Sequence, residues 1–169
     1  MKTIQWFACC KVLMVTIFLW LSTTNSQAQY VSLNKIEIQK LSELITVDND
    51  AKNIYLALEA SANKALTQLP NPIDTIISEG HLVTDPKKIR TQKSLADLNK
   101  IYSLAFAYKI TSKKEYLTKC IEYILAWANT NHGVGNPIND TKLDPVMEAY
   151  DLIKDEMPLS DRKIVNAWL

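Results

Sequence analysis

Polar side chains that could act on a sugar or on a proton gather in one stretch near the end of the sequence. Residues 127–152, "WANTNHGVGNPINDTKLDPVMEAYDL", contain His132, Asn136, Asn139 and Asp140. Amides and carboxylates at a cleft can bind saccharide hydroxyl groups, and a histidine that transfers protons needs burial and a nearby charge. Alternatively, Asn-Pro favours a turn, and Asn and Asp side chains bond their own backbone. The stretch is either a saccharide-binding edge, with Asn136 and Asn139 as candidate binding residues, or a capped connection between helices.

A second group of candidate binding residues lies in the irregular segment 70–93. Its loop "EGHLVTDP" holds His81, which either overhangs a cleft at the start of the next helix or is a plain loop residue. The only concentrated basic patch follows: Lys87, Lys88, Arg90 and Lys93. At the rim of a cleft these cations suit a polyanionic sugar, and on a solvated surface they need no ligand. His81 and Lys93 therefore join the candidate substrate-binding residues.

The sequence contains no other pattern that predicts catalysis or metal binding. It has two histidines and no H-x-x-H or C-x-x-C spacing, so no metal or cofactor is expected. Cys120 shares an apolar stripe with Leu117 and Ile124 at helical spacing. This spacing predicts a buried thiol, because a reactive cysteine needs exposure and a cationic neighbour.

The first 28 residues are typical of a secretory signal peptide. They have a basic start, an apolar run at 12–21, and small residues at the minus-three and minus-one positions of a cut before Gln29. The run is shorter than the ~20 residues that span a bilayer, so we expect a periplasmic or secreted protein. Residues 29–169 carry 17 basic and 18 acidic residues, a balance that argues against nucleic-acid binding and a membrane-surface role.

Residues 29–169 are expected to form one all-α domain. The chain has only three glycines, and no stretch alternates apolar and polar residues over the length of a strand. Two N-terminal helices are predicted, over 35–45 and 51–69, and the prolines of "LPNPID" end the second. The apolar face predicted for that second helix consists of Ile54, Leu58, Ala62, Ala65 and Leu69.

A buried helix followed by an amphipathic helix is predicted in the middle of the domain. The first begins at Ser94, where "SLAD" has the shape of a capping box. Between 101 and 108 only Ser103 is polar, so this helix must be covered on nearly every side. The second begins at a Thr111 or Ser112 cap and ends near "AWANTN".

Two further helices are predicted at the C-terminal end, one over 144–154 and one from Ser160. The last carries an apolar stripe made of Ile164, Val165, Trp168 and Leu169. Such a stripe needs a partner surface. It packs on earlier helices, on a second subunit through self-association, or on helices that would continue the chain.

The order of these elements resembles that of the alginate-lyase-like polysaccharide lyases. A buried helix, a short "TSKKEY" turn, a one-sided helix ending in "AWAN", an Asn-Pro loop and "EAYDL" carry the resemblance, over residues 79–169. It implies an (α/α) toroid, in which an outer ring of helices wraps an inner ring, with residues 29–169 as its N-terminal, incomplete portion. It also implies an exported enzyme that cleaves a uronate-containing polysaccharide by β-elimination.

That reaction sets clear requirements for the residues that perform it. The proton at C5 leaves, the 4-linked sugar is expelled, and an amide or a cation must neutralise the uronate carboxylate. A Tyr, His or Lys must take the proton. The family's Asn-His pair and catalytic Tyr fall beyond Leu169, so we expect a truncated chain without identified catalytic residues. The alternative is a non-catalytic helical module that binds a carbohydrate or a protein.

Overall fold

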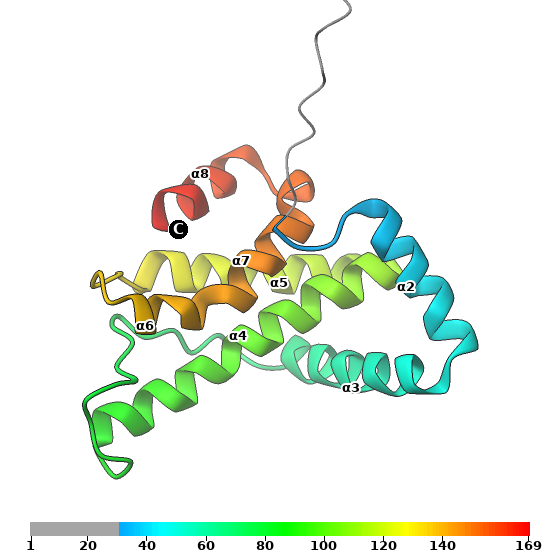
Figure 1. Cartoon of the computed structure of the whole chain (residues 1–169). Coiled ribbons are helices and arrows are strands. Elements are labelled where there is room, and N and C mark those ends of the chain that lie inside the picture. Colours follow the sequence, from blue (N-terminus) through cyan, green and yellow to red (C-terminus); the bar gives the residue numbers. More distant parts are fainter. Residues whose placement is uncertain (1–30) are drawn as a thin grey trace, which may run out of the picture.

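The computed structural model describes residues 31–169, and over this range the chain forms helices and no strands (Figure 1). The elements are α2 (Lys35–Val47), α3 (Asn49–Leu66), α4 (Pro86–Thr111), α5 (Lys114–Thr130), α6 (Pro137–Asp140), α7 (Asp144–Ile153) and α8 (Leu159–Trp168), with 3-10 turns at Thr141–Leu143 and Lys154–Glu156. The predicted all-α class is confirmed for this range. The predicted signal peptide, 1–28, lies outside the described residues.

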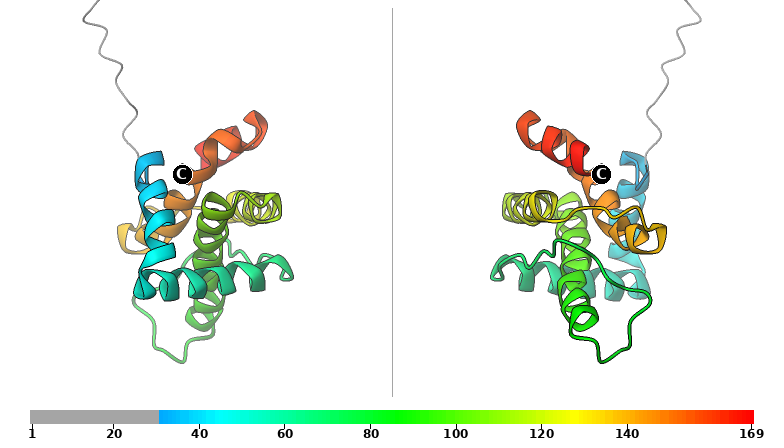
Figure 2. Two further views of the ribbon diagram at one scale, coloured as in Figure 1. Left: turned by 90° about the vertical axis from the view of Figure 1, so that its right-hand side faces the viewer. Right: turned by 90° about the vertical axis from the view of Figure 1, so that its left-hand side faces the viewer.

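Helix α4 is the centre of the molecule. It packs against α3, α5 and α7, which lie on different sides of it in Figures 1 and 2. Between residues 101 and 108 only Tyr102 is not fully buried, which confirms the prediction of a helix covered on nearly every side. Burial of apolar surface at ~25 cal/mol per Å² makes this packing the main stabilising contribution.

Helix α5 covers α4 with one face. The buried side chains of that face are Tyr116, Leu117, Cys120, Tyr123, Ile124 and Trp127. The predicted one-sided helix and the predicted burial of Cys120 are therefore confirmed. Burial raises the pKa of the Cys120 thiol, because an apolar interior disfavours the thiolate.

The predicted start of α4 is wrong by two turns. The helix begins at Pro86, and the carboxylate of Asp85 caps it by accepting the N–H of Lys87 at 2.8 Å. Asp-Pro is a strong start signal, since proline is tolerated at the first helical position. Ser94 and Asp97, predicted as a capping box, are instead buried inside the helix, where Asp97 is 1% exposed.

The predicted apolar face of α3 is also partly wrong. Ala62 and Ala65 are buried as predicted, but Ile54 is 66% exposed and Leu69 lies beyond the helix, 81% exposed. Tyr55 is buried instead of Ile54. The inward stripe begins one position later because the large ring of Tyr55 fills the space beside Phe106 of α4, with ring centroids 6.4 Å apart.

The predicted cap of α5 is wrong as well. Thr111 and Ser112 end α4, where Ser112 adopts the left-handed conformation with φ 58°. Lys113 precedes α5 without a side-chain capping bond. The hydroxyl of Thr111 donates to the carbonyl of Ala107 at 2.7 Å, so it serves the preceding helix.

The C-terminal apolar stripe is divided between the core and the surface. Val165 is buried and Trp168 packs against the core from α8, whereas Ile164 and Leu169 remain 40% and 47% exposed. Half of the stripe thus packs on earlier helices, which was one of the predicted options. Within residues 31–169 no helix combines the length and the apolar character that a membrane crossing requires.

The start of the described chain is fastened to α7. The Oδ2 atom of Asp151 accepts the backbone N–H groups of Val31 at 2.9 Å and Ser32 at 3.0 Å. Its Oδ1 atom accepts a bond from Lys154 at 2.5 Å. Burial alone would raise the pKa of Asp151, but the bonds from Lys154, Ser32 and Val31 outweigh it and lower the pKa.

Candidate functional site

A cleft of about 410 Å³ lies where the irregular segment after α3 passes the first turns of α4. Figure 1 shows this segment running beside the N-terminal end of α4. The residues that line the cleft are Ile73, Asp74, Thr75, Ile77, Pro86, Lys87 and Arg90. Two members of the predicted basic patch, Lys87 and Arg90, therefore belong to a hollow of the surface.

The irregular segment that forms one wall of the cleft is hydrogen-bonded to the residues that follow α5. Asn131, buried after α5, donates from Nδ2 to the carbonyls of Ile73 at 3.0 Å and Asp74 at 3.3 Å. The backbone N–H of His132 donates to the carbonyl of Asp74 at 2.8 Å. The Oδ1 atom of Asn131 accepts the indole N–H of Trp168 at 3.3 Å, so one amide joins the cleft wall to α5 and α8.

Helix α4 fastens the same segment from the other side. The hydroxyl of the buried Thr91 accepts the N–H of Ile77 at 3.2 Å. Asp97 accepts the N–H of Asn71 at 2.5 Å, and its Oδ2 atom lies 3.4 Å from the indole nitrogen of Trp127. These bonds give the backbone N–H groups of Asn71 and Ile77 acceptors within the protein, as buried backbone groups require. The segment is thus irregular in dihedral angles but fixed in place.

The charge at the cleft favours an anion. Lys87 and Arg90 are exposed, and the one carboxylate among the residues that line the cleft is that of Asp74, which lies 3.5 Å from Arg90. Both side chains of that pair are more than half exposed, so solvent screens the pair and it contributes little to stability. A carboxylate ligand can therefore compete with Asp74 for the guanidinium group, which binds carboxylates with two parallel bonds.

His81, a predicted binding residue, lies in the helix cap beside this cleft. Its Nδ1 atom is 2.6 Å from Oδ2 of Asp85, and Nζ of Lys88 donates to its carbonyl at 3.3 Å. The hydrogen bond from His81, followed by that from the N–H of Lys87, lowers the pKa of Asp85. The structure thus places His81 on the residue that caps α4, while Lys93 lies one turn beyond Arg90, exposed to solvent.

Asn136 and Asn139, the other two candidates, have structural partners. Asn136 caps α6 by accepting the N–H of Ile138 at 3.0 Å. Asn139 is buried, and its Oδ1 atom accepts the N–H of Ser78 at 3.2 Å and the hydroxyl of Ser78 at 2.5 Å. The polar loop therefore joins α6 to the segment that carries the cleft, and His132 is exposed beside it.

The cleft contains residues that the sequence patterns did not indicate. Asp74 and Thr75 line it, and Asn131 holds the backbone of Ile73 and Asp74 from more than fifty residues away along the chain. No local pattern marks Asn131, whereas Asp97 could have been noticed because it shares a helical face with the apolar Ile101 and Leu104. Among residues 31–169, no three acidic, histidine or cysteine side chains are grouped as a metal site would require.

Comparisons with protein-family models, with curated proteins and with solved structures find no match for the chain. The resemblance to alginate-lyase-like enzymes therefore rests on the order of the sequence motifs. The geometry of the described residues must carry any functional argument.

Proposed function

We propose that the protein is an exported polysaccharide lyase of the alginate-lyase type, which acts on a uronate-containing polysaccharide by β-elimination. The observation that carries the proposal is the cleft whose lining contains two cations, Lys87 and Arg90, and one carboxylate, that of Asp74. A uronate polymer presents one carboxylate on every sugar, which is the ligand such a surface favours.

The packing of the helices supports the same proposal. α4 is enclosed by α3, α5 and α7, as an inner helix of an (α/α) toroid is enclosed by its neighbours. The cleft lies at the N-terminal end of α4, where the helix dipole also favours an anion. We therefore propose that α4 is an inner helix and that the polymer crosses its first turns.

The cleft offers a distinct role to each polar group. Arg90 can exchange its exposed contact with Asp74 for a uronate carboxylate, and Lys87, on the same first turns, can bind the carboxylate of an adjacent sugar. The Thr75 hydroxyl can serve as donor or acceptor for sugar hydroxyl groups. The neighbouring Ile73 and Ile77 offer apolar surface to the sugar ring.

A non-catalytic carbohydrate-binding module is the second candidate. One observation favours it: within the described part of the chain, the residues that line the cleft include no tyrosine and no histidine, and the lysine among them, Lys87, is exposed to solvent. A lyase needs a tyrosine, a histidine or a lysine to take the C5 proton, and burial is what adapts a lysine to that task. In this case the cleft would bind the polymer without cleaving it.

The experiment that tests the proposal measures binding and cleavage together. The purified chain, after removal of the signal, is incubated with alginate and with glucuronan, and ultraviolet absorbance reports unsaturated uronate. Binding is measured on the same preparations by calorimetry at low salt. A rise in absorbance supports the lyase, binding without a rise supports the second candidate, and neither signal contradicts both.

Charge-removal variants then locate the binding surface. We expect Lys87→Ala and Arg90→Ala to weaken polymer binding, each by about tenfold at low salt because one charged contact is lost. Lys40→Ala is the matched control, since Lys40 is exposed on α2 and lies outside the cleft. Equal losses in all three variants would show that bulk charge, and not the cleft, binds the polymer.

A further inference from the structure

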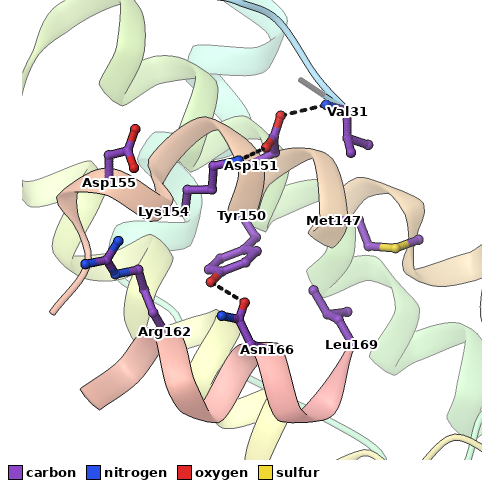
Figure 3. A pocket seen from close by; sticks show the side chains of 9 residues that line it. All are labelled: Val31, Met147, Tyr150, Asp151, Lys154, Asp155, Arg162, Asn166 and Leu169. Carbon is purple, nitrogen blue, oxygen red and sulfur yellow. Dashed lines mark hydrogen bonds and ion pairs between the residues drawn. The ribbon is translucent and has the colours of Figure 1, made fainter. Parts of the chain in front are cut away.

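A second cavity, of about 440 Å³, lies between α7 and α8 and is formed by residues other than those of the cleft (Figure 3). Its lining combines the apolar side chains of Met147 and Leu169 with the polar side chains of Tyr150, Arg162 and Asn166. The volume lies within the ~300–1,000 Å³ of small-molecule sites, and mixed apolar and polar walls are typical of such sites.

Arg162 is the cation of this cavity that lacks a partner within the described chain. Its Nε atom is buried without a hydrogen bond, and no ion pair joins it to any carboxylate of residues 31–169. Buried hydrogen-bond donors nearly always have an acceptor. Leaving a charged donor without one costs more free energy than leaving a neutral donor without one. The Nε atom therefore lacks an acceptor within the described chain, and the half-buried guanidinium group has no carboxylate partner there.

The two acidic residues that line the cavity do not meet this need. Asp151 already accepts three hydrogen bonds, from Val31, Ser32 and Lys154. Asp155 lines the cavity but lies beyond ion-pair distance of Arg162. Two cations and two acidic side chains line the cavity, and Lys154 is paired with Asp151. Arg162 is then the single cation that can pair with a ligand, which suits one negative charge together with polar hydroxyl groups better than a multiply charged anion.

Tyr150 of α7 and Asn166 of α8, one turn after Arg162, supply further polar groups to the cavity. The hydroxyl of Tyr150 donates to Oδ1 of Asn166 at 2.6 Å, so the amide nitrogen of Asn166 stays available as a donor. Figure 3 shows this nitrogen on the side of Arg162, with the Tyr150 ring beside it. An aromatic wall, an amide donor and a guanidinium group together match a sugar ring that carries hydroxyl groups and a carboxylate.

We propose that this cavity binds one carboxylated monosaccharide unit. The guanidinium group of Arg162 pairs with its carboxylate, the amide of Asn166 donates a hydrogen bond to a hydroxyl group, and Asp155 accepts a hydrogen bond from another hydroxyl group. Tyr150, Met147 and Leu169 cover the apolar face of the ring. The inference is independent of lyase activity and of the cleft at α4, because it concerns a separate site.

The test titrates the full chain with D-glucuronate by calorimetry, beside D-glucose and inorganic phosphate. We expect glucuronate to bind and the other two probes to bind at least about tenfold more weakly, since each lacks either the charge or the ring. Equal binding of glucose or phosphate, or no binding of glucuronate, overturns the proposal. A uronate trisaccharide separates two sources of this ligand. If it binds as tightly as glucuronate, the cavity binds the end of a polysaccharide chain. If it does not bind, the cavity binds the free monosaccharide.

Variants assign the binding to the cavity. Arg162→Gln should weaken glucuronate binding at least about tenfold, whereas Lys163→Gln, on the exposed side of α8, should leave it unchanged. Thermal unfolding checks that Arg162→Gln folds. If it does not, Asn166→Ala tests the same site from an exposed position, and unchanged binding there contradicts the proposal.

The two sites are distinguished by crossing the measurements. Arg90→Ala should weaken polymer binding and leave glucuronate binding intact. Failure of polymer binding in the unmodified chain, with glucuronate still bound, would reject the proposed function and retain this inference. An Arg90→Ala variant that loses both ligands would overturn the claim of a separate cavity site.

Discussion

The two halves of α4 have opposite surroundings although they belong to one continuous helix. The first turns, from Pro86 to Lys93, carry exposed cations along the cleft, whereas residues 101–108 are enclosed by α3, α5 and α7. Asp97 lies between the two halves and is buried with Trp127 and the N–H of Asn71 as partners. The first half therefore offers charge to a ligand, and the second half anchors the helix in the core.

This difference teaches how a binding surface can vary without loss of the fold. The enclosed half carries most of the packing, so it should tolerate few substitutions. The exposed half contributes few buried contacts, so its side chains should be replaceable at little cost in stability. The following predictions test this contrast, and they are ordered by their expected effect on the free energy of unfolding.

The largest effect is expected at the junction. Asp97→Ala removes the acceptor for Asn71 and Trp127 and leaves Lys100, which lies 3.0 Å from Asp97, without its partner. The variant leaves two N–H donors without an acceptor and a partly buried ammonium group without its partner, which together cost about 4 kcal/mol. Urea unfolding followed by circular dichroism measures the loss. Asp97→Asn keeps an acceptor and should lose less, and equal losses in both variants would contradict the proposed role of Asp97 as a hydrogen-bond acceptor.

The enclosed half should show the next largest effect. Leu104→Ala opens a cavity among fully buried neighbours, which costs about 3 kcal/mol. The same urea titration measures it. Leu82→Ala, in the exposed loop before α4, serves as the control and should change the free energy of unfolding by less than about 0.5 kcal/mol. A small loss at Leu104 would mean that α4 is not the centre of the core.

Acid should weaken the exposed half first. The pKa of Asp85 is lowered in the folded chain, so its contribution to stability is complete above the ordinary carboxyl pKa. It is lost as the pH falls through the lowered folded-state value. Hydrogen exchange should therefore accelerate at the first turns of α4 before residues 101–108. Asp85→Asn keeps a capping acceptor but does not titrate, so its first turns should show no such pH dependence.

The smallest effect on stability is expected at the cleft. Arg90→Ala removes a solvent-screened contact with Asp74, so the free energy of unfolding should change by less than about 0.5 kcal/mol. Thermal unfolding measures this, on the preparations used for polymer binding. A large loss of stability would mean that Arg90 holds the cleft together and does not merely line it.

The enclosed half could be predicted from sequence, because the run from 101 to 108 contains a single polar residue and such a run must be covered. The start of the helix could not. "SLAD" and "TDP" both carry start signals, and only tertiary packing decides between them. Ser94 and Asp97 are buried and both accept hydrogen bonds from Asn71 of the irregular segment, whereas Asp85 is partly exposed. Local pattern cannot reveal that a carboxylate has a partner 26 residues away.

Only one wall of the candidate site could be predicted from the sequence. The sequence indicated a basic patch, and Lys87 and Arg90 of that patch do line the cleft. The facing wall depends on Asn131, whose contacts with Ile73 and Asp74 span 58 and 57 residues. Asn139 was singled out for ligand binding, but its side chain binds Ser78. An amide is equally suited to a sugar hydroxyl and to a backbone N–H, so residue type alone does not distinguish these roles.

The two hydrogen bonds that Asp151 accepts from the N–H groups of Val31 and Ser32 have a mechanical consequence. A pulling force applied at residue 31 reaches α7 directly and bypasses α2, although α2 follows in the chain. The tension would therefore be resisted by α7, which packs against α4. Helix α2 has no buried residue, and it would bear load only after the hydrogen bonds to Asp151 had broken. Single-molecule extension of the Asp151→Ala variant should then lack the first rupture event.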